Sequence, residues 1–156
     1  MIKTNFLLPR NFRFVGIFFL IVGFILGIAR FKYGFKPDLL DFKMFAFYSS
    51  YIESKYMEIV RNNMGEELTG FFIVTGLFFI AFAREAEESE LTQMLRLKAF
   101  FLAAYLNFFF LLFALFFTFG FAFVYALMAN MGFGLLTFIV SFRILYWINR
   151  SKETSQ

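Results

Sequence analysis

The chain contains no cysteine and no histidine in its 156 residues. The first absence excludes disulfides, thiolate nucleophiles and iron–sulfur clusters, and the second excludes imidazole as a base or a ligand. A metal would have to bind carboxylates alone, and the acidic residues all lie outside the long apolar runs. We therefore expect no metal and no cofactor.

Charge is the next absence. Residues 99–142 contain no Asp, Glu, Lys or Arg. A bilayer core takes about 20 apolar residues per helix, so this stretch fits two spans with a turn at Gly120. Backbone in lipid must satisfy its own hydrogen bonds, which favours helices. Two shorter apolar runs, 14–29 and 68–83, come first. The sequence predicts an all-α integral membrane protein, a single membrane domain over 1–156. It would be a bundle of four transmembrane helices at 14–29, 68–83, 99–119 and 121–142.

Phenylalanine is abundant, with 30 residues, and 61% of the chain is hydrophobic against about 45–50% in soluble domains. A lipid-facing position accepts Phe at no cost in transfer energy, so codon bias in an AT-rich genome explains this content. An aromatic cage for a ligand would also need converging polar groups. We favour the first explanation.

The first apolar run has a second interpretation. Lys3, Arg10 and Arg13 precede it, and Gly27-Ile28-Ala29 resembles a signal-peptidase site. Its glycines are better explained as the packing face of a helix that stays in the protein. We expect an uncleaved span.

The distribution of basic residues predicts the orientation. With four spans, the N-terminus, the 84–98 loop and the C-terminus lie on one side and carry nine of the 15 Lys and Arg residues. Around the last two spans, all of the flanking positive charge lies on that side. The positive-inside rule places both termini in the cytoplasm, with 31–67 as an outer loop. The net charge of +4 follows from these span ends, so we expect no nucleic-acid partner.

The outer loop has the pattern of an amphipathic helix. Pro37 suits a first helical turn, and Asp38 and Asp41 suit its positive end. Further along, one face of a helix would carry Tyr48, Ile52, Tyr56, Ile59 and Val60. Asn62, Asn63 and Gly65 are typical of a helix stop. This helix would lie on the outer leaflet, or alternatively dock a partner through its aromatic face.

The 84–98 loop is the most charged segment. Ser89 is positioned to cap a helix that begins at Glu90. The acidic residues Glu85, Glu87, Glu88 and Glu90 should project away from anionic lipid, which makes them the candidate contact with a cytoplasmic partner.

Small and polar residues fall on one face of each span. Because lipid gives helices no hydrophobic drive to associate, such faces mark close packing and interhelical hydrogen bonds. Asn107 and Asn130 should both lie near the midplane, within reach of each other across the last hairpin. The predicted packing and polar-core residues are Gly16, Gly23, Gly27, Gly76, Asn107, Asn130, Gly134, Thr137 and Ser141.

The segments REAEESELTQMLRLKAF and AYLNF, followed by FGFAFVYALMANMGF and LLTF, resemble a group of small uncharacterised four-span proteins of Bacteroidota. The resemblance runs from Arg84 toward the C-terminus. It implies a bacterial inner-membrane location, and it assigns no activity and no functional residue.

The predicted spans carry no Asp, Glu, Lys or Arg, which argues against proton pumps, voltage sensors and ion-coupled transporters. We expect a non-enzymatic accessory protein that assembles through its small-residue faces with another membrane protein or with itself. The alternative is a passive channel or carrier for a small neutral or apolar solute, lined by Asn107, Asn130, Thr137 and Ser141. A lipid-modifying enzyme using Glu66, Glu67 or the 85–90 acids ranks last, because no base-activated nucleophile accompanies them.

Overall fold

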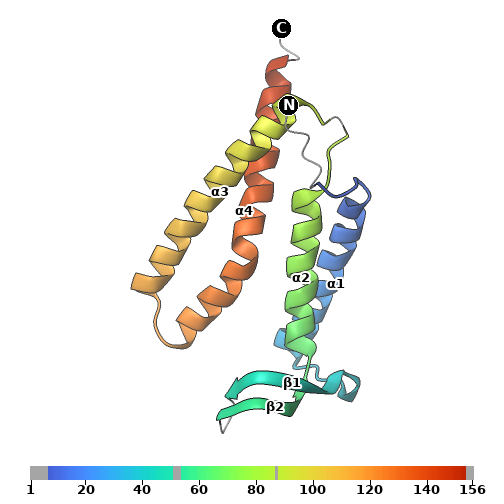
Figure 1. Ribbon diagram of the computed structural model, residues 1–156, viewed down its shortest axis with the longest axis vertical. Coiled ribbons are helices and arrows are strands. Elements are labelled where there is room, and N and C mark those ends of the chain that lie inside the picture. The colour runs from blue at the N-terminus through green and yellow to red at the C-terminus, as the bar shows by residue number, and fades with distance from the viewer. Residues whose placement is uncertain (1–6, 51–53, 87, 154–156) are drawn as a thin grey trace. The chain divides into compact units, whose positions relative to one another are not determined.

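The computed structural model describes residues 7–50, 54–86 and 88–153. In chain order the elements are helix α1 (Phe12–Tyr33), a 3-10 turn η1 (Asp38–Leu40), strands β1 (Asp41–Ser50) and β2 (Ser54–Asn63), and helices α2 (Gly65–Phe82), α3 (Glu90–Phe117) and α4 (Phe121–Glu153) (Figure 1).

The described residues contain four helices that are long and apolar enough to cross a membrane. The prediction of four transmembrane helices is therefore confirmed, and the architecture is that of a multi-pass membrane protein. Each predicted span lies almost wholly inside one helix. The helices mostly extend beyond the apolar runs, most of all α4, which continues through Tyr146 and Trp147 to Glu153.

Local chemistry fixes the helix ends. Glu66 and Glu67 lie in the first turn of α2, where carboxylates interact favourably with the helix dipole. The Ser89 hydroxyl accepts a hydrogen bond from the Thr92 backbone N–H and so caps α3. Gly120 adopts φ +60° in the turn between α3 and α4, a conformation that glycine adopts without steric cost.

The predicted amphipathic helix in the outer loop is wrong. Residues 41–63 form an antiparallel hairpin in which Tyr48 opposes Tyr56 and Phe45 opposes Ile59. Aromatic and β-branched residues suit a pleated surface, and here that preference outweighs a spacing that also fits a helix. Pro37 precedes only the short turn η1. Ile52 lies outside the described residues.

The two asparagines that suggested a helix stop instead close the base of the hairpin. Asn63 Nδ2 donates to Asp41 Oδ1 over 2.8 Å and to the Pro37 carbonyl over 3.1 Å. Asn62 Nδ2 donates to Glu67 Oε1 over 2.7 Å, which joins the end of β2 to the first turn of α2.

The chain divides into two compact units, one formed by residues 1–19 with 74–156 and the other by residues 20–73. In the first unit α3 and α4 pack against each other along small residues of α3. Ala99 is fully buried and Ala103 nearly so, and they pack in one core with Phe138 and Phe142 of α4. Small side chains on one helix thus admit aromatic rings from the next.

Candidate functional site

The predicted packing glycines of α1 lie at close approaches to α2 in both units. In the first, a Cβ added to Gly16 would lie 2.8 Å from the Gly76 carbonyl oxygen. In the second, a Cβ on Gly23 would lie 2.7 Å from Ile73 Cγ1, and one on Gly27 would lie 3.3 Å from Thr69 Cγ2. Only glycine allows the backbones this close at Gly16 and Gly23.

Asn107 of α3 and Asn130 of α4, together called the amide pair, meet directly. Asn130 Nδ2 donates to Asn107 Oδ1 over 2.8 Å. Gly134, one turn further along α4, leaves room for them, because a Cβ there would lie 3.4 Å from Asn107 Oδ1. The rings of Phe110 and Phe133 stack beside them with centroids 4.4 Å apart.

Thr137 and Ser141 do not join the amide pair. The Thr137 hydroxyl donates within its own helix, to the carbonyls of Phe133 and Gly134. Ser141 is buried nearer the other end of α4. Of the five packing and polar-core residues predicted for the last two spans, the structure therefore brings together Asn107, Asn130 and Gly134.

A cavity of about 340 Å³, called the amide cavity, opens beside the amide pair. Its lining is mainly apolar, with the rings of Phe82, Phe100 and Phe138 on its walls. A second apolar cavity of about 240 Å³ shares these three rings and is also lined by Leu7, Leu97, Gln93 and Arg96. Thr137 and Ser141 are not among the residues that line either cavity.

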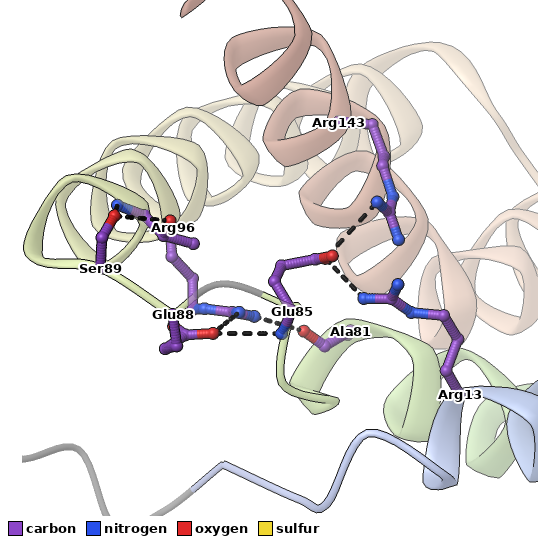
Figure 2. Close-up of polar contacts among 8 residues, drawn as sticks. Arg13, Ala81, Glu85, Glu88, Ser89, Arg96 and Arg143 are labelled. Carbon is purple, nitrogen blue, oxygen red and sulfur yellow. Dashed lines mark hydrogen bonds and ion pairs between the residues drawn. The ribbon is translucent and has the colours of Figure 1, made fainter. Parts of the chain in front are cut away.

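Among the described residues, five charged side chains form a connected group, called the charged cluster. It consists of Arg13 of α1, Glu85 and Glu88 of the segment before α3, Arg96 of α3 and Arg143 of α4 (Figure 2). Glu85 is at its centre, with its side chain only 8% exposed. Its Oε1 accepts from Arg13 Nη2 over 2.5 Å and lies 3.4 Å from Arg143 Nη1.

Arg96 organises the other half of the charged cluster. Its Nη2 donates to Glu88 Oε2 over 3.4 Å, and its Nη1 donates to the Ala81 carbonyl over 3.1 Å. That carbonyl belongs to the last turn of α2, where helical partners run out. The guanidinium also lies 4.6 Å from the centre of the Phe142 ring, a cation–π distance. The same Glu88 oxygen accepts from the Glu85 backbone N–H, as Figure 2 shows.

Two of the loop acids that we consider as a contact with a cytoplasmic partner are ion-paired within the chain. Glu85 and Glu88 are held by arginines of the same chain because unpaired carboxylates this poorly exposed would be costly. Glu90 is exposed in the first turn of α3, and Glu87 lies outside the described residues. Sequence reasoning missed the arginines as partners, since Arg13 and Glu85 are 72 positions apart and no local pattern links them.

The acids considered for lipid chemistry are also engaged. Glu66 Oε1 accepts from Arg30 Nη2 over 2.7 Å, and Glu67 accepts from Asn62. Among the described residues, no group of three or more acidic side chains is arranged to hold a metal ion. The Arg30–Glu66 pair joins the last turns of α1 to the first turn of α2.

The hairpin exposes apolar side chains on both faces. Opposed residues of a hairpin share a face, so Phe45 and Phe47 lie with Ile59 on one face, and Phe42 and Met44 lie with Val60 on the other. Phe47 is 74% exposed and Ile59 71% exposed. The exposed residues Phe42, Met44, Phe45, Phe47, Tyr56 and Ile59 are called the hairpin surface.

Comparison with known proteins finds no matching family model, no similar curated protein and no similar solved structure.

Proposed function

We propose that the protein is a non-enzymatic interaction protein of a bacterial inner membrane, which recognises another membrane protein or a second copy of itself. The distribution of Lys and Arg supports cytoplasmic termini, with the β1–β2 hairpin on the outer side.

The hairpin surface carries this proposal. In the described part of the chain the sheet has two strands, so each strand has an unpaired edge. A two-stranded hairpin is marginally stable alone in water, and an open edge is a template for another strand. Exposed apolar side chains on both faces add the signature of a contact surface. A partner strand that pairs with an edge would satisfy the open backbone groups, and by covering one face it would also bury exposed apolar side chains.

The small-residue faces have a different role in the proposal. The closest glycine approaches join α1 to α2, and the amide pair joins α3 to α4, so these faces hold one chain together. The remaining helix surface is rich in Phe and Leu and suits contact with lipid. The hairpin is therefore the better candidate for recognising a partner than the small-residue faces.

The solute carrier is the second candidate. The amide cavity favours it, because it places polar groups inside an apolar opening among the spans. Against it, Thr137 is bonded within its own helix and Ser141 does not line the cavity. Asn107, Asn130, Thr137 and Ser141, the residues predicted to line a solute path, therefore do not form one continuous polar path.

Site-specific photocrosslinking in intact cells tests the interaction proposal. A benzophenone amino acid at Phe47 should give one discrete protein adduct, and the same probe at Phe117, which is 70% exposed on α3, should give none. Ile59→Lys on the same hairpin face as Phe47 should reduce the adduct at least tenfold. Mass spectrometry of the adduct distinguishes a second copy from another protein. Lipid adducts alone at both positions, or an adduct insensitive to Ile59→Lys, would contradict the proposal.

A further inference from the structure

The amide cavity is lined by two amides whose hydrogen-bonding groups are only partly used by the described residues. One hydrogen bond joins the amide pair, so one asparagine keeps its NH₂ donors and the other keeps its carbonyl acceptor. If the oxygen and nitrogen positions of both amides were exchanged, one free NH₂ group and one free carbonyl oxygen would still remain.

Both asparagines line the amide cavity. Among the described residues, the buried side-chain atoms without a partner are Arg13 Nε, Glu88 Oε1 and Arg96 Nε, and no amide atom is among them. The remaining polar atoms of Asn107 and Asn130 are thus not sealed inside the protein, and the cavity that both residues line offers space for a ligand to pair with them. Within a span, where water is excluded, an unsatisfied amide is costly, and a ligand that pairs with it gains correspondingly.

We infer that the amide cavity binds a long-chain fatty acid in its protonated form. A neutral carboxyl group carries a carbonyl acceptor beside an O–H donor, which matches the free NH₂ and free carbonyl of the amide pair. A carboxylate has no donor and would bring an unpaired charge among Phe82, Phe100 and Phe138, so the ionised form is disfavoured.

The shape of the site supports an acyl chain as the rest of the ligand. The walls beside the amide pair are mainly apolar. The second cavity shares three of their rings, so an apolar surface extends from the amide cavity to Leu97 and Leu7. A mainly apolar pocket with a few converging polar groups is the usual form of a small-molecule site. Because the opening lies among membrane-spanning helices, its ligand is expected to come from the bilayer.

The test uses purified full-length protein in detergent with carboxyl-¹³C palmitic acid, observed by NMR during a pH titration. The wild-type protein should show a bound carboxyl resonance that titrates at higher pH than palmitic acid in empty micelles, since the cavity stabilises the protonated form. Tenfold excess methyl palmitate, which lacks the O–H donor, should not displace it. Displacement by the ester, or titration identical to that in empty micelles, would overturn the inference.

Two variants locate the ligand. Ala104 lines the cavity and is exposed, so Ala104→Leu should fill the site without disturbing the fold and remove the bound resonance. Ala122→Leu, an exposed alanine of α4 that does not line the cavity, is the matched control and should keep it. The double change Asn107→Leu with Asn130→Leu should weaken binding at least tenfold. Equal binding by the two alanine variants would place the ligand elsewhere and overturn the inference.

Discussion

At the residue scale, the amide pair shows how one hydrogen bond can fix the register of two spanning helices. A hydrogen bond between helices in a membrane contributes about 0.6–2 kcal/mol. Its larger effect is to disfavour other registers of the two helices. Sliding α3 along α4 would break this hydrogen bond and leave both amides unpaired in an apolar environment.

A double-mutant cycle tests this role. Asn107→Leu or Asn130→Leu alone leaves one amide without its partner and should destabilise the protein by about 1–3 kcal/mol. The double variant should be less destabilised than the two single costs added, and unfolding in detergent measures the difference. Asn149→Leu on α4, paired with Asn107→Leu, is the control and should be additive. Additivity at Asn130 as well would show that the amide pair does not couple the helices.

The glycine contacts give a second residue-scale prediction. A methyl group at Gly16 would lie 2.8 Å from a backbone oxygen of Gly76, so α1 and α2 would have to move apart there. Gly16→Ala should destabilise the protein by about 1–3 kcal/mol, the usual cost of overpacking.

Gly70→Ala is the matched control for that change. Open space surrounds the position of its added methyl group, and alanine is the better helix former. This variant should be neutral or stabilised by up to about 1 kcal/mol in the same unfolding measurement. Equal destabilisation by the two substitutions would contradict the role of Gly16 in allowing α1 and α2 to pack closely.

At the element scale, the charged cluster connects residues from several helices through one short segment. Glu85 contacts arginines of α1 and α4, and Glu88 contacts Arg96 of α3, whose guanidinium also reaches the end of α2. The segment between α2 and α3 is therefore a structural junction, which its acidic composition alone does not reveal.

Replacing the central carboxylate tests the junction. Glu85→Gln removes the negative charge that Arg13 and Arg143 share, and should destabilise the protein by on the order of 3 kcal/mol. The control is Arg61→Gln, which removes an exposed partner of Asp41 in the hairpin and should cost no more than about 1 kcal/mol. Similar small losses in both variants would contradict a structural role for the charged cluster.

The elements also show how far sequence reasoning extends. The four helices are predictable because long apolar runs have one stable backbone form in lipid. The hairpin was missed because Tyr48, Tyr56 and Ile59 fit a helical face, while their aromatic and branched side chains also suit paired strands. The pairing of Asn107 with Asn130 follows from depth in the membrane, whereas Arg13 and Glu85 meet only through the tertiary fold.

At the scale of the whole molecule, hydropathy and the positive-inside rule together predict an alternating path across the membrane. With both termini in the cytoplasm, as we propose, α1 would lead outward to the hairpin and α2 would lead back to the segment that holds Glu85 and Glu88. The hairpin surface would then face partners outside the membrane, and Glu90 would lie on the cytoplasmic side.

Cysteine accessibility tests this central claim most directly, since the natural chain contains no cysteine to interfere. Phe47→Cys in the hairpin and Glu90→Cys at the start of α3 both replace exposed residues. In intact spheroplasts, a membrane-impermeant maleimide should label Cys at position 47 fully and Cys at position 90 only after permeabilisation. Labelling of both positions from the outside, or of position 90 alone, would contradict the four-span topology or its orientation.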